Sequence, residues 1–159
     1  MVLIDASTQW SHVCLLSTRN HAFAKLIAQI IRIKASFTEH HIKSIRMDNT
    51  SEFSFRAFND YCMAQGIEVH HSFTYVHTQN GLAESLIKRI KIIARLMLHN
   101  CNLPTSCWGH AVLHAADLIQ LRPTAYHNNS PLQLVHGNPP SISHLRKLGC
   151  VVYVPISRP

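Results

Sequence analysis

Acidic residues are scarce in this sequence of 159 residues, which has 8 Asp and Glu against 15 Lys and Arg. Charged residues make up 14% of the chain, whereas roughly a quarter is usual. The net charge of +7 favours a polyanionic partner, and nucleic acid before a membrane, because no segment has the pattern of a basic amphipathic surface helix. A basic protein whose charges are merely solvated is the alternative that composition leaves open.

Long apolar runs are also missing, since none approaches the ~18 residues that a membrane span needs. The N-terminal stretch has neither the basic region nor the cleavage pattern of a secretory signal, and we find no targeting signal. The five cysteines are scattered, and the closest pair, Cys101 and Cys107, does not have zinc-knuckle spacing. We therefore expect no zinc site, and free thiols in a reducing compartment.

Hydrophobic residues, at 47%, are sufficient for one sizeable core and exclude a disordered chain. Patterns typical of strands lie at residues 2–5, 10–17, 41–48, 67–72 and 149–156. Patterns typical of helices lie at residues 23–32, 53–66, 81–99 and 104–119. Strands that alternate with helices predict an α/β fold, and the opening hairpin predicts that its sheet is mixed.

Helical periodicity also predicts which faces are buried. In the helix at 23–32, Ile31 is expected on the buried stripe and Gln29 on the polar face. In the helix that Pro104 opens, Trp108, Ala111, Ala115 and Leu118 are expected to face inward.

The helix at 81–99 carries an unusual polar face. At 100° per residue, it places Glu84, Lys88, Lys91 and Arg95 within one narrow arc. The opposite stripe, expected to be buried, consists of Leu82, Leu86, Ile90, Ile93 and Met97. A solvated face with an i,i+4 Glu–Lys pair is the simpler interpretation.

Asp48 favours a functional interpretation, because it stands at the carboxyl end of a predicted strand, where α/β sheets usually place their sites. Thirty-five residues separate it from Glu84, which follows the turn-forming pair Asn80-Gly81. Two carboxylates from different elements suit Mg²⁺ or Mn²⁺, and two such ions ~4 Å apart stabilise an in-line displacement at phosphorus. Lysines further along the helix are then expected to bind the DNA backbone, and Gly81 to let the loop pass close to the substrate.

Four stretches carry a family resemblance: "DNTSEF" (48–53), "HTQNGLAES" (77–85), "LPTSCWGHAVLHAADLI" (103–119) and "LRKLGCVVYVP" (145–155). In this order and spacing they resemble the integrase catalytic core of copia-type long-terminal-repeat retrotransposons, a part of the pol polyprotein, especially in plants. The resemblance implies a ribonuclease-H-like fold and a D,D-35-E (DDE) triad in which Asp48 and Glu84 match the second and third positions.

The same resemblance implies a function and its partners. The family performs DNA integration, processing transposon ends and joining them to target DNA with a two-metal site that uses Mg²⁺ or Mn²⁺. Transposon-end and target DNA, a possible homo-oligomer and a nuclear location are therefore expected, with no membrane. The residues expected to contact DNA are Asn80, Gly81, Lys88, Lys91 and Arg95.

The first triad position is where the sequence departs from the family. "IDASTQW" (4–10) resembles the family's second strand, so we expect the first strand, its catalytic aspartate and the upstream zinc module to be missing. Asp5 is then expected to be a turn residue. The implied organisation is an N-terminally truncated integrase core at residues 1–121 and a C-terminal extension at 122–159.

Three hypotheses follow for the function. The chain is an integrase-type polynucleotidyl transferase, or an inactive relic that only binds nucleic acid, or a generic ribonuclease-H-like nuclease. The third is disfavoured because the segments after the triad resemble integrases. We expect the isolated chain to be inactive, since two catalytic carboxylates are too few for a two-metal site.

Overall fold

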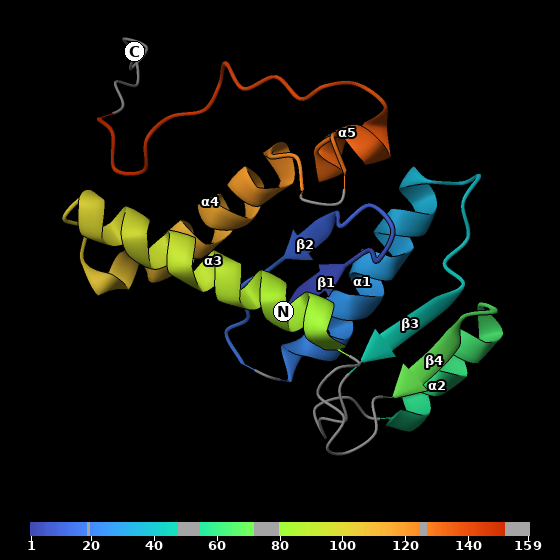
Figure 1. The fold of residues 1–159 in the computed structure, drawn as a ribbon. Helices are drawn as coiled ribbons and strands as arrows, with labels where there is room; N and C mark the ends of the chain where they lie inside the picture. The colour runs from blue at the N-terminus through green and yellow to red at the C-terminus, as the bar shows by residue number, and fades with distance from the viewer. Residues whose placement is uncertain (19, 48–54, 72–79, 125–126, 152–159) are drawn as a thin grey trace, which may run out of the picture. The chain divides into compact units, whose positions relative to one another are not determined.

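The computed structural model describes residues 1–18, 20–47, 55–71, 80–124 and 127–151, whose helices and strands are labelled in Figure 1. The chain divides into two compact units. The first consists of Met1 with Leu15–Glu84, and the second of Val2–Cys14 with Ser85–Pro159. This division into compact units does not test the predicted domain boundary between residues 121 and 122, which stays a prediction.

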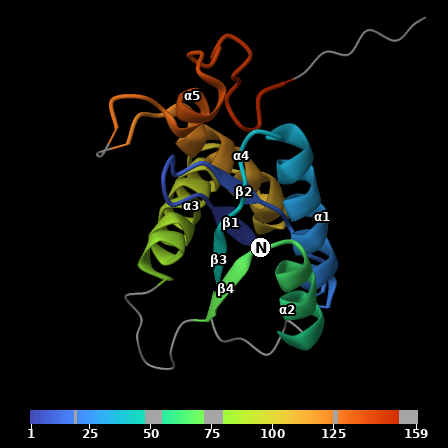
Figure 2. The same ribbon diagram turned by 90° about the vertical axis from the view of Figure 1, so that its right-hand side faces the viewer.

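The first unit contains α1 (His21–Ser36), β3 (Ser44–Met47), α2 (Phe55–Ala64) and β4 (Glu68–His71). Strands β3 and β4 pair in parallel, with Ser44 opposite Glu68 and Met47 opposite His71. Figure 2 shows the two strands side by side, with α2 beside them. Because the strands are parallel, their carboxyl ends lie at the same edge of this sheet.

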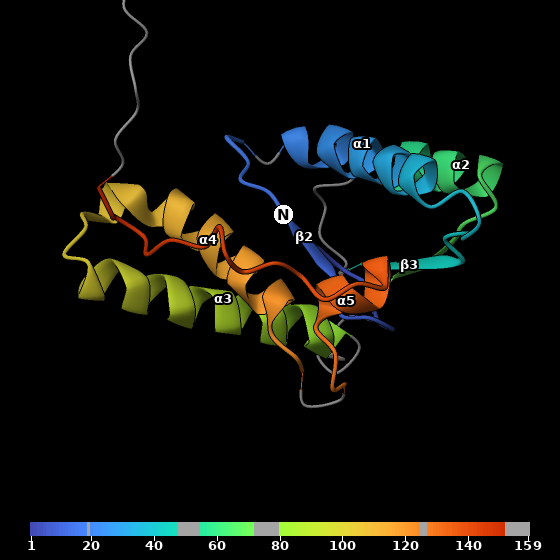
Figure 3. The same ribbon diagram turned by 90° about the horizontal axis from the view of Figure 1, so that it is seen from above.

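Helices α1 and α2 lie side by side in the first unit (Figure 3), and aromatic packing joins them. The rings of Phe23 and the fully buried Phe58 meet edge to face, with centroids 6.3 Å apart. At the rim, the Lys34 Nζ donates a hydrogen bond of 2.6 Å to Gln65 Oε1. Helix α2 ends at Ala64, two residues before the predicted stop at Gly66, whose φ of 68° lies in the left-handed region that favours glycine.

The predicted faces of α1 are partly wrong. Gln29 was placed on the polar face but is 7% exposed, and Ile31 was placed on the buried stripe but is 54% exposed. The buried side of the helix instead includes Ala22, Leu26 and Ile30. Helical periodicity predicts the buried face from residue hydrophobicity alone. The elements packed against the helix determine which face is actually buried, and in α1 that face is shifted toward the small Ala22.

The second unit begins with an antiparallel pair, β1 (Val2–Ile4) and β2 (Ser11–Val13), in which Val2 lies opposite Val13. The long helix α3 (Gly81–Asn100) enters this unit at Ser85. A short 3₁₀ turn (Thr105–Cys107) then leads into α4 (Trp108–Leu121), and α5 (Pro131–His136) follows. The Ser130 side chain accepts a hydrogen bond from the Gln133 N–H and so caps α5.

Helices α3 and α4 pack against each other and form the core of the second unit, as Figures 1 and 3 show. Small residues allow the close approach, because Ala94, Ala111 and Ala115 are fully buried. The core consists of Leu86, Ile90, Ala94 and Leu98 from α3, with Ala111, Ala115, Ala116 and Ile119 from α4. The partly buried Val2, Ile4 and Val13 of the hairpin pack on this core.

Several predicted inward positions in α3 and α4 are wrong. Leu82 is 39% exposed, and the buried stripe of α3 runs through Ala94 and Leu98 instead of the predicted Ile93 and Met97, which are only partly buried. Trp108 was also predicted to face inward, yet it is 37% exposed at the start of α4. The contact of α4 with the core begins at Ala111, and Trp108 lies before it, at the first residue of the helix.

The predicted α/β fold is confirmed, and both antiparallel and parallel pairing are present. The described strands form two separate two-stranded sheets. The predicted strand at 149–156 is wrong for residues 149–151, which are turn and coil, and its remainder lies outside the described residues. Within the described ranges, no helix combines the length and the apolar character that crossing a membrane requires.

Candidate functional site

Glu84 lies in the first turn of α3, with its side chain exposed. The helix begins at Gly81, and a carboxylate in the first turn is favoured because it faces the positive end of the helix dipole. In the part of the chain that the structure describes, the Glu84 carboxylate has no hydrogen-bond or ion-pair partner. It is therefore accessible to a cation from solution.

The polar face of α3 is basic after this residue. Lys88, Lys91 and Arg95 are all exposed, as the helical arc predicts. At 100° per residue the exposed His99 continues the same arc, about 60° from Glu84. We call Lys88, Lys91, Arg95 and His99 the α3 stripe. Its role in binding DNA stays a prediction, but its exposure meets the first requirement for one.

The other predicted site residues are only partly described. Asp48 lies outside the described residues, so its predicted convergence with Glu84 stays a prediction. Strand β3 ends at Met47, directly before it. Asn80 is half-buried before α3, and a Cβ added to Gly81 would meet no atom within 4 Å. Nothing in the described protein requires glycine there, and its role toward a substrate stays a prediction.

Asp5 is a turn residue, as expected. Its Oδ2 accepts hydrogen bonds from the Thr8 N–H at 2.8 Å and from the Thr8 hydroxyl at 2.6 Å. The backbone closes the same turn, because the Asp5 N–H donates to the Trp10 carbonyl and the Gln9 N–H donates to the Asp5 carbonyl. The carboxylate therefore stabilises the β1–β2 connection, in which Gln9 has a positive φ of 59°.

The predicted metal ligands, two carboxylates, are of the type that hard divalent ions prefer. Mg²⁺ and Mn²⁺ prefer carboxylate oxygens and retain several waters, which an exposed glutamate such as Glu84 permits. Among the described residues no three His, Cys, Asp or Glu side chains gather into a metal-binding group. Of the two carboxylates predicted to bind metal, Glu84 is the one whose surroundings are described.

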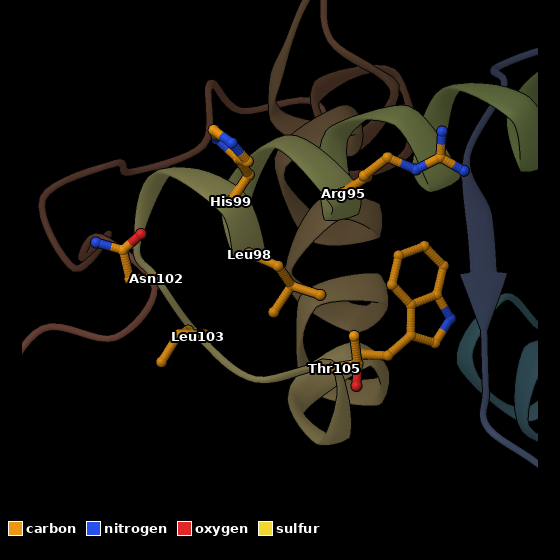
Figure 4. A pocket seen from close by; sticks show the side chains of 7 residues that line it. Arg95, Leu98, His99, Asn102, Leu103 and Thr105 are labelled. Atoms are coloured by element: carbon orange, nitrogen blue, oxygen red, sulfur yellow. The ribbon is translucent and has the colours of Figure 1, made fainter.

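A surface pocket of about 420 Å³ lies at the other end of α3, where the chain turns into α4 (Figure 4). Arg95 and His99 of the α3 stripe project from the helix on its rim, and Thr105 lies on the segment that enters α4. The full lining consists of Arg95, Leu98, His99, Asn102, Leu103, Thr105 and Trp108. The stripe therefore leads from Glu84 into a pocket that the sequence did not predict.

A defined turn shapes this pocket. Asn102 has a φ of 50°, the Leu103 N–H donates to the Leu98 carbonyl at 3.0 Å, and the Asn102 N–H donates to the His99 carbonyl at 3.2 Å. These two hydrogen bonds, together with the left-handed conformation of Asn102, form a Schellman motif. In this motif the side chain of the residue after the left-handed one usually makes an apolar contact with that of the residue whose carbonyl accepts the longer-range bond. Here those side chains are Leu98 and Leu103, which both line the pocket.

Sequence reasoning missed His99, Asn102, Thr105 and Trp108 as candidate binding residues. For His99, the signal was available, since it continues the arc of Glu84 and Arg95. For Trp108, the helical pattern pointed inward, and only its position at the first turn of α4 makes it a surface residue.

Sequence comparison places the chain beside plant transposon proteins. It is 28% identical over 159 residues to the retrovirus-related Pol polyprotein from transposon TNT 1-94 of Nicotiana tabacum, covering 99% of this chain and 12% of that protein. It is 31% identical over 113 residues to the Pol polyprotein from transposon RE2 of Arabidopsis thaliana, covering 70% of this chain and 8% of that protein. The chain thus spans about a tenth of these relatives. No family model matches it.

Solved structures with the same fold come from retroviral integrases. A chain of the simian T-cell lymphotropic virus intasome, solved with the PP2A regulatory subunit B56 gamma, matches with a TM-score of 0.66 and 21% identity, over 91% of this chain and 51% of that one. The HTLV-2 integrase catalytic core in complex with magnesium, in a trimeric form, matches with a TM-score of 0.59 and 22% identity, over 85% and 82%. The fold is therefore that of integrase catalytic cores, which is ribonuclease-H-like.

Proposed function

Since its homologues are retrovirus-related Pol polyproteins of plant transposons and its fold is that of integrase cores, we propose that this chain is an integrase core that acts on DNA. The observation that carries the proposal is the sequence similarity over 99% of the chain, a span within which the positions of Asp48 and Glu84 both lie. In the polyprotein we assign it metal-dependent polynucleotidyl transfer, the joining of transposon ends to target DNA.

The α3 stripe is proposed to hold the DNA backbone. Lys88 and Lys91 lie one and two turns after Glu84 and are exposed, so phosphates bound to them lie beside the carboxylate. Lysine ammonium groups bind phosphate as point charges without reading sequence. Replacing both by alanine is expected to lower the salt dependence of DNA affinity, the slope of log K against log [salt], by about 2.

Asp48 and Glu84 are proposed to hold Mg²⁺ or Mn²⁺ against a DNA phosphate, and the HTLV-2 core was solved with magnesium. The bound metal supplies Lewis-acid stabilisation of charge at the phosphate under attack. The chain's own contribution is positional. Glu84 is held on a rigid helix, and the cations that follow it orient the phosphate backbone along that helix.

A second candidate is nucleic-acid binding without chemistry. The hydrogen bonds of Asp5 favour it. Asp5 is the carboxylate at a strand end ahead of Asp48, and its Oδ2 accepts hydrogen bonds from Thr8 within a turn instead of facing a metal site. In the polypeptide of residues 1–159, the strand-end carboxylate ahead of Asp48 and Glu84 is then held by its own turn. We propose that this polypeptide alone binds DNA and does not join ends.

The test is donor-end joining by purified 1–159 with Mn²⁺ and matched donor DNA, beside the variants Asp5→Asn and Glu84→Gln. We expect DNA binding in all three proteins and joined product in none. Joining by the parent that both variants lack would make Asp5 a metal ligand and overturn the assignment of its turn role. Cleavage of an RNA–DNA hybrid, with no preference for donor ends, would instead indicate a ribonuclease-H-like nuclease.

Two further proposals concern the setting of this activity. We propose a nuclear site of action, because the target of integration is chromosomal DNA, and a fluorescent fusion excluded from nuclei would contradict it. We also propose that the core self-associates, since its structural relatives include dimeric and trimeric forms of the HTLV-2 core. Sedimentation velocity at micromolar concentration tests this.

A further inference from the structure

The pocket between α3 and α4, defined above by its seven lining residues, contains side chains that binding of the DNA backbone does not require. Backbone binding needs cations, which the α3 stripe supplies. The pocket adds an indole from Trp108, two leucine side chains and two neutral polar side chains, Asn102 and Thr105. An aromatic surface beside cations is the combination by which proteins bind unpaired bases.

We propose that this pocket binds one unpaired nucleobase of single-stranded DNA, stacked on Trp108, with the adjoining phosphate held by Arg95. The inference rests on the proposed function, because it extends the DNA path along α3. The indole is 37% exposed although tryptophan is usually highly buried, so it has a face available for a ligand. Arg95 belongs both to the stripe and to the lining.

The size and the available hydrogen bonds suit a base. A volume of about 420 Å³ lies at the lower end of the range for small-molecule sites, which fits one planar group better than an extended chain. Leu98 and Leu103 supply an apolar floor. The Asn102 amide and the Thr105 hydroxyl supply donors and acceptors for a base edge, and within the described ranges neither side chain has a hydrogen-bond partner.

The charge of α3 selects nucleic acid over other aromatic ligands. The α3 stripe rises along roughly 16 Å of helix from Lys88 to His99, at 1.5 Å per residue, and reaches the pocket through Arg95 and His99. Glu84 is the acidic residue of this helix, and it lies at the opposite end from the pocket. A strand whose phosphates follow the stripe therefore arrives at Trp108 with a base free to stack.

Two oligonucleotides separate stacking from electrostatics: a twelve-nucleotide oligo(dT) and an abasic strand of the same length, which has the phosphates without the bases. Affinities are measured by fluorescence anisotropy at one fixed salt concentration. In a Trp10→Phe background, Trp108 is the remaining tryptophan of the 2 in the chain, and its emission reports the stacking directly.

Trp108→Ala is expected to weaken oligo(dT) binding by about tenfold and to leave abasic binding within twofold. Trp108→Phe is expected to recover most of the loss, which a role in folding alone would not explain if both variants unfold at the same temperature. Arg95→Gln is expected to weaken both oligonucleotides. The matched control, Arg32→Gln on the exposed face of α1, is expected to change neither.

Failure of the inference is distinct from failure of the proposed function. Equal binding of oligo(dT) and the abasic strand, or no effect of Trp108→Ala, overturns the base pocket even when duplex binding through Lys88 and Lys91 persists. Absence of binding to both duplex and single strands overturns the proposed function and this inference together. A Trp108-dependent affinity for an acidic peptide that exceeds that for oligo(dT) would assign the pocket to protein and overturn the inference.

Discussion

Replacing Asn102 by alanine perturbs the turn that shapes the α3–α4 pocket without removing buried surface, because its side chain is exposed. Its φ of 50° lies in the left-handed region, which costs an ordinary L-residue roughly 1–2 kcal/mol and asparagine less. We therefore expect Asn102→Ala to lower the free energy of unfolding by about 1 kcal/mol. For a chain of this size that corresponds to a Tm lowered by about 2–4 °C.

Two control variants isolate the conformational cause. Asn102→Gly retains access to the left-handed region, so its free energy of unfolding is expected to stay within about 0.5 kcal/mol of the parent. Asn100→Ala, two residues earlier in the last turn of α3, replaces a poor helix former by a good one and is expected to be neutral or stabilising by a few tenths of a kcal/mol. Urea denaturation followed by far-UV circular dichroism measures all three. The reasoning is refuted if Asn102→Ala is as stable as Asn100→Ala.

Three other perturbations test the fold. Ala115→Leu adds volume at the fully buried α3–α4 contact and is expected to lower the free energy of unfolding by about 1–3 kcal/mol, against no loss for Ala35→Leu on the exposed side of α1. Asp5→Ala removes two turn hydrogen bonds and is expected to cost roughly 1–2 kcal/mol at pH 7, with no cost indicating that the turn holds without them. Burial raises the pKa of the Cys62 thiol, so iodoacetamide at pH 8 should label the exposed Cys150 long before Cys62, and equal rates would contradict the buried position. For the same reason the folded state retains the Cys62 proton more tightly than the unfolded state, so this thiol lowers stability as the pH rises past its ordinary pKa of 9.0.

Helix α3 shows how far sequence reasoning reaches. Its bounds were expected at residues 81–99 and are Gly81–Asn100, because a glycine after a polar loop and a sustained 3.6-residue period are local signals. Its exposed face was also predicted, since charged side chains seldom lie buried. The buried face was predicted less well, because Ala94 is buried by the approach of α4, a tertiary effect that hydrophobicity does not encode.

The candidate site also has parts that the sequence could predict and parts that it could not. Glu84 and the stripe that follows it could be located from helical spacing, and Asp5 could be assigned to a turn. The pocket could not be predicted, because it depends on the left-handed conformation of Asn102 and on an indole that the helical period placed inside. Both are consequences of how the chain turns between α3 and α4. The convergence of Asp48 with Glu84 stays a prediction.

The most direct test of the central claim is the divalent-metal dependence of DNA affinity in the parent, Glu84→Gln and Asp48→Asn, measured by anisotropy at constant ionic strength. In EDTA, Glu84→Gln is expected to bind duplex DNA slightly more tightly than the parent, since it removes a negative charge that precedes the α3 stripe on the same helix. With Mn²⁺, the parent is expected to gain severalfold in affinity while both variants gain nothing, because the ion needs both carboxylates to reach the phosphate. An equal Mn²⁺ gain in all three proteins would contradict the assignment of Asp48 and Glu84 as a shared metal site.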